Sequence, residues 1–241
     1  MSATDAEHLL DNPIWHALTT AHAHLAEGDG LARRYPPTVT PLAGMIEQST
    51  AAYASLAAAL RGQSHAAVFL DSAPVPPRGW ELHRAQLITQ MVWRGDGATA
   101  TEARITVLGS ADIQEMMALA RLTEPGPFGP RALELGSYVG IRSGEQLVAM
   151  AGERLHIAGY TEVSAVCTHP DHRRRGYSQM LVGAVVNNIL ARGETPILHV
   201  KTENRGAIQV YEKAAFRVRR QIHFGMLGPP ASDNPRADSE Q

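Results

Sequence analysis

The chain has 241 residues, of which 44% are hydrophobic and 19% charged, and its formal net charge is −2. This composition is typical of a globular protein that can bury a sizeable core. The small negative charge does not suit a protein that adheres to nucleic acid. Since the sequence shows neither an apolar run long enough for a membrane helix nor a secretory signal, we expect a cytoplasmic protein that binds neither membrane nor nucleic acid.

The first hundred residues predict a mixed region of helices and strands. Pro13 and the apolar positions Ile14, Leu18 and Leu25 predict a helix that stops before Gly28. A second helix is expected over 50–61 and a strand over 66–70, followed by a Pro-rich linker over 72–79. The segment 82–93 fits a strand or a short helix, and periodicity does not decide between them.

A turn at 95–97 marks the boundary that we expect between two domains. Beyond it we expect helices over 111–122, 176–191 and 206–215 and strands over 105–108, 137–141, 146–155, from 160, 196–201 and 217–227. This alternation predicts an α/β fold with a mixed, partly parallel sheet flanked by helices. The expected division is a mixed α/β N-terminal domain over 1–100, a second α/β domain over 101–228 and a disordered tail over 229–241.

A basic turn precedes the helix expected from residue 176. Arg173, Arg174 and Arg175 stand directly before Gly176, and Pro170 opens the turn. The first turn of a helix offers unpaired backbone N–H groups and the positive end of the helix dipole, which suit a phosphate. Gly176 lets a diphosphate approach the backbone, and the arginines add charged donors. The sequence therefore predicts a diphosphate ligand here.

Two motifs in this half of the chain resemble the GNAT superfamily of N-acetyltransferases. Arg173-x-x-Gly176-x-Ser178 resembles its coenzyme A signature, and the segment 204–216, with Asn204, Tyr211 and Phe216, resembles its N-x-x-A-x-x-x-Y-x-x-x-G-F segment. The resemblance covers residues 103–227, and the layout looks similar to the glycine N-acyltransferase-like branch. It implies a GNAT fold, acetyl-CoA as the donor, no metal, and a primary amine of a small molecule or amino acid as the acceptor, with an N-terminal domain that covers the acceptor side.

The sequence departs from the family pattern at two positions. Ser178 replaces the usual Gly or Ala, which is a modest enlargement at a helix N-terminus. Ala215 replaces the usual Gly at the end of the last helix, and a left-handed backbone there would cost about 1 kcal/mol.

The resemblance also implies roles for individual residues. Tyr211 would protonate the departing thiolate, since a phenol stays protonated at neutral pH. Glu162 would deprotonate the amine, directly or through water, with His156, His169 and His172 as alternative bases. The residues expected to bind the coenzyme are Val166, Cys167, Thr168, Arg173, Arg174, Arg175, Gly176, Tyr177, Ser178 and Asn204.

Other interpretations remain open at this point. The protein could bind acetyl-CoA without catalysis, as a sensor or regulatory module, or, more remotely, use its arginines on nucleic acid. Cys167 is the only cysteine, has no His/Asn partner pattern and is expected in a strand rather than as a nucleophile. We expect a monomer or a homodimer. The large side chains considered for the acceptor pocket are Trp80, Met91, Trp93, Phe128, Met150 and His156.

Overall fold

A computed structural model describes residues 7–97 and 104–230 of the chain. Its centre is an eight-stranded sheet with the strand order β4-β11-β5-β10-β9-β8-β7-β6. These strands are β4 (Ala66–Leu70), β5 (Glu81–Trp93), β6 (Ile105–Leu108), β7 (Tyr138–Ser143), β8 (Gln146–Ile157), β9 (Tyr160–Thr168), β10 (Thr195–Lys201) and β11 (Phe216–Gly228). Neighbouring strands are antiparallel except β9 and β10, which are parallel, so the predicted mixed, partly parallel sheet is confirmed.

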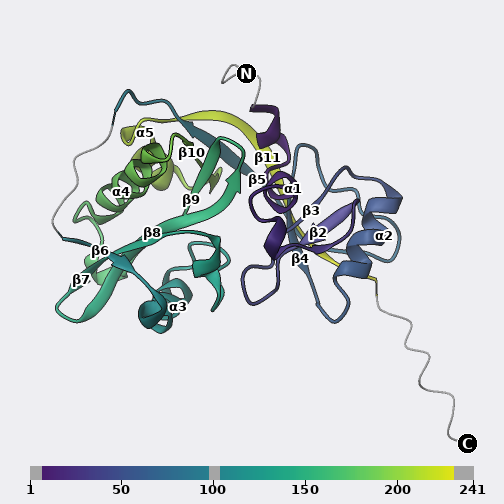
Figure 1. Cartoon of the computed structure of the whole chain (residues 1–241), viewed down its shortest axis with the longest axis horizontal. Coiled ribbons are helices and arrows are strands. Elements are labelled where there is room, and N and C mark those ends of the chain that lie inside the picture. Colours follow the sequence, from purple (N-terminus) through teal and green to yellow (C-terminus); the bar gives the residue numbers. More distant parts are fainter. Residues whose placement is uncertain (1–6, 98–103, 231–241) are drawn as a thin grey trace, which may run out of the picture.

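Helices cover both faces of this sheet (Figure 1). On one face lie α4 (Tyr177–Ala191) and α5 (Arg205–Lys213), and α3 (Ile113–Thr123) covers the other. Val139 of β7 belongs to the core beneath α4, whereas its neighbour Tyr138 belongs to the core beneath α3. Successive side chains of a strand point to opposite faces of the sheet. The apolar side chains on one face of the strand therefore pack against α4, and those on the other face pack against α3.

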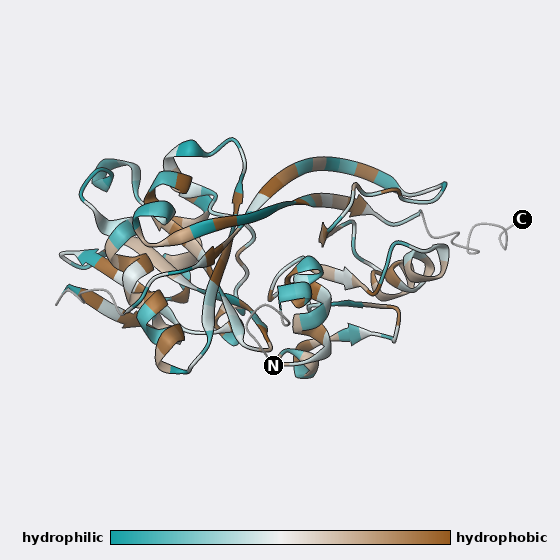
Figure 2. Cartoon of the chain, turned by 90° about the horizontal axis from the view of Figure 1, so that it is seen from above, coloured by the Kyte–Doolittle hydropathy of each residue, from teal (hydrophilic) through white to brown (hydrophobic). Residues whose placement is uncertain are grey.

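The N-terminal region adds a small sheet of β1 (Glu27–Gly28), β2 (Ala32–Arg34) and β3 (Ala43–Met45), together with α1 (Pro13–Thr19) and α2 (Thr50–Ala59). It is joined to the main sheet by β5 and β11, which pair along thirteen-residue strands and arch between the two parts (Figure 2). Residues of α1 share one buried core with residues of β8, β10 and β11. The main sheet thus takes strands from both sides of residue 100, and the expected division into domains stays a prediction.

Most of the expected elements are present, with corrections in the N-terminal region. The first helix ends at Thr19 instead of continuing to Leu25, because the backbone of Thr20 leaves the helical region with φ −128° and ψ −103°. At this end the hydroxyls of Thr19 and Thr20 donate to the carbonyls of Trp15 and His16. Residues 82–93 belong to a strand, not a helix. The small sheet was not predicted from the sequence. Residues 231–241 of the expected tail lie outside the described residues.

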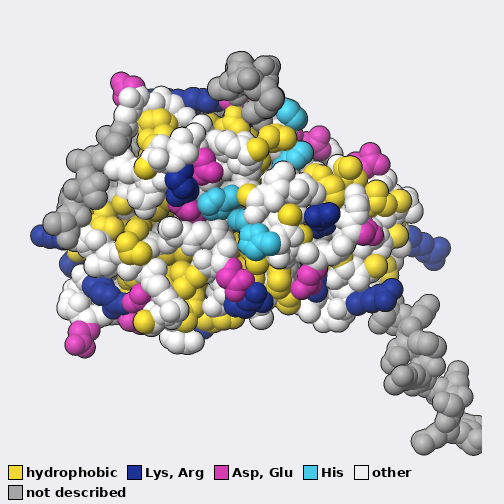
Figure 3. Space-filling model, in the orientation of Figure 1, with side chains coloured by type: hydrophobic (Ala, Val, Ile, Leu, Met, Phe, Trp, Pro, Cys, Tyr) yellow, Lys and Arg dark blue, Asp and Glu magenta, His cyan; other side chains and the backbone are white. Residues whose placement is uncertain are grey.

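Charged side chains are spread over the surface. On the face shown in Figure 3, the basic and acidic groups are interspersed. Within the described residues, no helix is both long and apolar enough to cross a membrane.

Candidate active site

The two parallel strands of the main sheet separate after a short paired stretch. β9 and β10 pair only from Tyr160 to Glu162 on one strand and from Thr195 to Ile197 on the other. Beyond this point β9 follows β8, while β10 follows β5. A cavity of about 590 Å³ opens at the split, lined by Val166 of β9 and by residues 199–201 of β10. The fork therefore exposes the backbone and side chains of both strands to a ligand.

A β-bulge lies in β9 beside the fork. Cys167 pairs with Met150 and Ser164 pairs with Gly152, so β9 has one more residue than β8 over this stretch. Ala165 has a positive φ of 52°, which is uncommon for a residue other than glycine. A bulge leaves its extra residue outside the ladder, so backbone groups next to Val166 are free for a ligand instead of the neighbouring strand.

The basic turn has the backbone geometry of an anion site. Arg174 has a φ of 63° and Gly176 a φ of 79°, and α4 starts at Tyr177 without a side-chain cap. Left-handed residues in such a turn direct successive N–H groups to one side, and the open N-terminus of α4 adds more donors. A Cβ on Gly176 would meet nothing within 4 Å, so the glycine is required here by its backbone conformation.

A second cavity, of about 480 Å³, runs from the basic turn to α5. Among the residues expected to bind the coenzyme, its lining includes Val166, Cys167, Thr168, Arg173, Ser178 and Asn204. Arg174, Arg175, Gly176 and Tyr177 belong to the same turn but are not part of the lining. The hydroxyl of Ser178 lies 3.2 Å from that of Thr168, so the larger residue at this position is accommodated. Asn204 caps α5 by accepting from the N–H of Ala207 at 3.1 Å.

Cys167 is a buried strand residue with no sign of nucleophilic activation. It packs in the core beneath α3, and burial raises the pKa of its thiol to about 11. A thiol with a raised pKa is a poor nucleophile at neutral pH.

Tyr211 lies where the two cavities meet. It projects from α5 and lines both of them, together with Val166 and Asn204. Burial raises the pKa of its phenol to about 12, so the hydroxyl keeps its proton throughout the neutral range. The structure thus puts a protonated phenol between the cavity that begins at the basic turn and the cavity at the fork.

Glu162 is fully buried and both of its carboxylate oxygens are occupied. Oε2 accepts from Arg154 Nε at 2.9 Å, and Oε1 accepts from Arg154 Nη2 at 2.6 Å and from His199 Nδ1 at 2.7 Å. Burial alone would raise the pKa of Glu162, but Arg154 and His199 outweigh it and hold this pKa at about 2. A carboxylate held in this way is a weak base, so the geometry argues against direct proton abstraction by Glu162 and leaves a route through water as a prediction.

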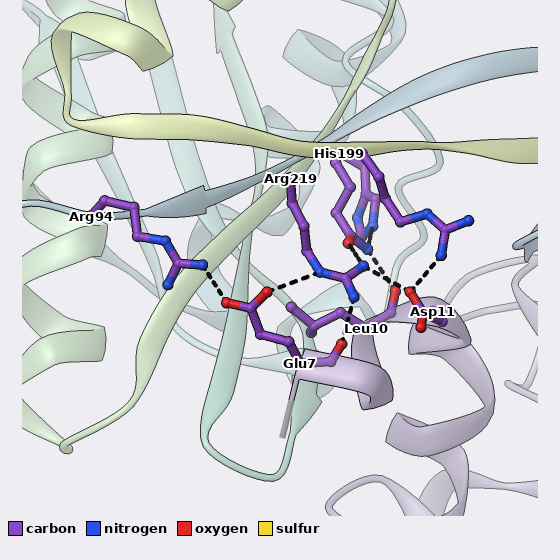
Figure 4. A network of polar contacts seen from close by, with 8 residues as sticks. Glu7, Leu10, Asp11, Arg94, His199 and Arg219 are labelled. Carbon is purple, nitrogen blue, oxygen red and sulfur yellow. Dashed lines mark hydrogen bonds and ion pairs between the residues drawn. The ribbon is translucent and has the colours of Figure 1, made fainter. Parts of the chain in front are cut away.

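A network of polar side chains continues from His199 to the N-terminal segment (Figure 4). Gln90 Oε1 accepts from Arg219 at 2.8 Å, and Gln90 Nε2 donates to the carbonyl of Leu10 at 2.7 Å. These two bonds fix the orientation of the amide. The amide nitrogen of Gln90 also lies 2.9 Å from His199 Nε2. Because an amide nitrogen only donates, His199 Nε2 accepts this hydrogen bond, and His199 Nδ1 carries the hydrogen that is donated to Glu162.

The remaining candidate bases lie elsewhere. His156 Nε2 lies 3.3 Å from Glu153, away from the lining of either cavity. His169 accepts from the N–H of Asp171 within the basic turn, and His172 belongs to the short 3-10 helix Pro170–His172 of that turn. Among the described residues, no group of three His, Cys, Asp or Glu side chains is arranged to hold a metal ion.

Comparison with known proteins decides the family. The model of the FR47-like protein family matches residues 138–224, the stretch that carries the fork, the basic turn and α5. A solved structure from Novosphingobium aromaticivorans, assigned to the GNAT family of acetyltransferases, is 36% identical, with a TM-score of 0.87 over 92% of this chain and 99% of that one. The chain belongs to the GNAT family. The superfamily inferred from the two motifs is therefore confirmed, and with it acyl transfer as the general activity.

A more distant GNAT structure supports the fold alone. A GCN5-related N-acetyltransferase from Kribbella flavida is 16% identical, with a TM-score of 0.58 over 93% of this chain and 95% of that one. No curated protein matches the chain. The comparisons do not show the glycine N-acyltransferase-like branch of the GNAT superfamily.

The lining of the fork cavity differs from the large side chains expected for a GNAT acceptor pocket. Of the large side chains considered for the acceptor pocket, only Phe128 lines the cavity, from the loop after α3. Met91 and Met150 are fully buried core, and Trp80 packs on Tyr53. Trp93 lies at another depression, beside residues 95–97. The cavity of this GNAT protein is also lined by Arg154 and His199, which the sequence did not predict as pocket residues. Only the pairing register of their strands brings these two side chains to the fork.

Proposed function

We propose that this protein is an acetyl-CoA-dependent N-acetyltransferase that acetylates the primary amine of a small molecule or amino acid. The observation that carries the proposal is Tyr211, which lies between an anion-binding turn with its cavity and a second, open cavity at the fork. Acetyl-CoA supplies an acetyl group already activated as a thioester. No covalent bond to the protein is then needed, and a ternary complex with direct attack by the amine suffices.

The basic turn and the second cavity offer groups whose charge and hydrogen bonding suit coenzyme A. The left-handed turn and the uncapped start of α4 offer backbone N–H groups to the diphosphate, with Arg173 beside them in the cavity wall. Arg174 and Arg175 are exposed in the same turn and suit the third phosphate. The bulge in β9 leaves backbone groups for the amides of the pantetheine arm, as a strand added to an open edge would use them.

In this proposal Tyr211 donates its proton to the departing thiolate. Its raised pKa keeps the phenol protonated, and its place between the cavities puts it near the junction of donor and acceptor. The amine loses its proton to water in the cavity. Glu162 contributes by fixing Arg154 and His199 at the cavity wall and takes no proton directly from the amine.

The test is release of free coenzyme thiol from acetyl-CoA in the presence of a broad panel of amines. The proposal predicts amine-dependent thiol release together with formation of the acetylated amine by mass spectrometry. Tight binding of acetyl-CoA without transfer to any amine would instead support the non-catalytic sensor. The open cavity of about 590 Å³ next to Tyr211 favours the enzyme, because a sensor needs no room for an acceptor.

A further inference from the structure

The fork cavity carries an excess of positive side chains. Arg84, Arg121 and Lys201 line it, and the residues described in the structure offer none of these three side chains an ion pair or hydrogen bond. Glu124 is the acidic residue in the lining. Since the whole chain has a net charge of −2, this positive excess is local and not a property of the surface at large.

These cations come from separate elements that converge on one cavity. Arg84 lies on β5, where Arg84, Gln86 and Ile88 point to the same face because side chains alternate along a strand. Arg121 lies in the last turn of α3, and Lys201 ends β10. A solvated helix or strand face would place its charges along one element, so convergence from three elements indicates a binding function.

Arg154 adds buried hydrogen-bond donors to the same cavity. Its side chain is only 10% exposed, and Nε and Nη2 are both bonded to Glu162. Nη1 has no hydrogen-bond partner within the part of the chain that the structure describes, and it lies 4.0 Å from the position that a Cβ on Gly126 would take. A guanidinium N–H that faces a cavity is satisfied by water or by an oxygen of a ligand.

The rest of the lining is largely apolar. It includes Leu42, Phe69, Ile88, Phe128, Phe224 and Met226. The ring of Phe69 also lies under Arg154, 5.5 Å from the guanidinium carbon. A ligand that matches this cavity has an apolar body and an anionic group.

We propose that the acceptor amine also carries a carboxylate, as an amino acid with an apolar side chain does. This inference rests on the proposed acetyl transfer and names the class of its acceptor. Arg84, Arg121 and Lys201 supply charge for the carboxylate, Arg154 supplies donors, and Glu124 suits the ammonium group of the same molecule. The phosphates of the coenzyme have their own site at the basic turn, which leaves these cations to the acceptor.

The experiment compares matched acceptors that differ only in the carboxylate. L-Phenylalanine is measured against 2-phenylethylamine, and L-leucine against 3-methylbutylamine, by thiol release from acetyl-CoA. We expect kcat/KM to be at least about tenfold higher for the carboxylated member of the better pair, as one charge-assisted contact provides. Equal or faster transfer to the carboxylate-free amines would overturn this inference and leave the proposed function intact. Transfer to no amine at all, with acetyl-CoA bound, would overturn both.

Substitutions of the cavity arginines test whether these side chains bind the carboxylate of the acceptor. The double variant Arg84→Gln/Arg121→Gln should raise KM for the carboxylated acceptor by about tenfold or more, raise KM for the carboxylate-free amine by a much smaller factor, and leave the Kd for acetyl-CoA unchanged. Arg61→Gln is the matched control, since Arg61 is an exposed arginine that does not line the cavity. A weaker affinity for acetyl-CoA in the double variant would assign these arginines to the coenzyme and overturn the inference.

Discussion

Replacement of Glu162 by Gln tests whether this carboxylate is a structural anchor or a base. The structure binds both of its oxygens to Arg154 and His199, and these partners lower its pKa from 4.5 to about 2. At 1.36 kcal/mol per pH unit, this shift corresponds to about 3 kcal/mol of stability at neutral pH. Removal of one partner from a buried ion pair typically lowers the free energy of unfolding by about 3–5 kcal/mol, which agrees with the value from the pKa shift.

The sign of the pH dependence follows from the direction of the shift. A carboxylate whose pKa is lower in the folded state contributes stability above its unfolded pKa of 4.5 and loses it as the pH falls through about 2. The free energy of unfolding of Glu162→Gln should therefore be about 3 kcal/mol below that of the native protein at pH 7, and the difference should shrink below pH 4.5.

Urea denaturation at pH 7 and at several pH values below 4.5 measures this difference. Glu47→Gln is the control, because Glu47 is exposed and the same change there should alter stability by less than about 0.5 kcal/mol. A structural role for Glu162 is refuted if Glu162→Gln has a free energy of unfolding within about 0.5 kcal/mol of the native protein while acetyl transfer and the acid limb of the pH profile of kcat/KM are lost. That result would restore Glu162 as the direct base.

Two further substitutions test the role of Tyr211 and the backbone at the end of α5. Tyr211→Phe should lower kcat by about one to three orders of magnitude in the thiol-release assay, with little change in the Kd for acetyl-CoA, and an unchanged kcat would remove Tyr211 from the mechanism. Ala215→Gly should raise the free energy of unfolding by about 1 kcal/mol and Tm by about 2–4 °C, because Ala215 has a φ of 65° that glycine adopts without strain. A calorimetric Tm that stays the same or falls would show that alanine is not strained at position 215.

The parts of the site that sequence predicts are those built from consecutive residues. The basic turn, the start of α4 and the cap at Asn204 are each specified by neighbours in the chain, and all are present in the structure. Ala215 has a φ of 65°, so the left-handed backbone that would make alanine costly at this position of the family pattern is present. Local signals of this kind do not depend on how distant strands pair.

The polar anchor of the site could not be predicted in the same way. Arg154, Glu162, His199 and Gln90 lie on four different strands, and their contacts depend on the register of each strand pair. The bulge at Ala165 shifts one of these registers, and no residue type in β9 announces it. Strand register also explains why Met91 and Met150 were considered for the acceptor pocket but are buried in the core. A shift by one residue along a strand exchanges a position that faces the cavity for one that faces the core.

Calorimetric titration with acetyl-CoA measures whether the basic turn binds the diphosphate of the coenzyme. The measurement compares the native protein with Gly176→Glu and with Gly193→Glu, a change at the other end of α4 where the glycine has a similar φ of 76° and equally open surroundings. Both variants carry the same strain and the same charge, so their difference isolates the anion site. Binding of the diphosphate at the turn predicts that Gly193→Glu retains the native Kd and that Gly176→Glu weakens binding at least about tenfold, through repulsion between the new carboxylate and the diphosphate. Equal affinity of the two variants, or no binding by the folded native protein, would contradict it.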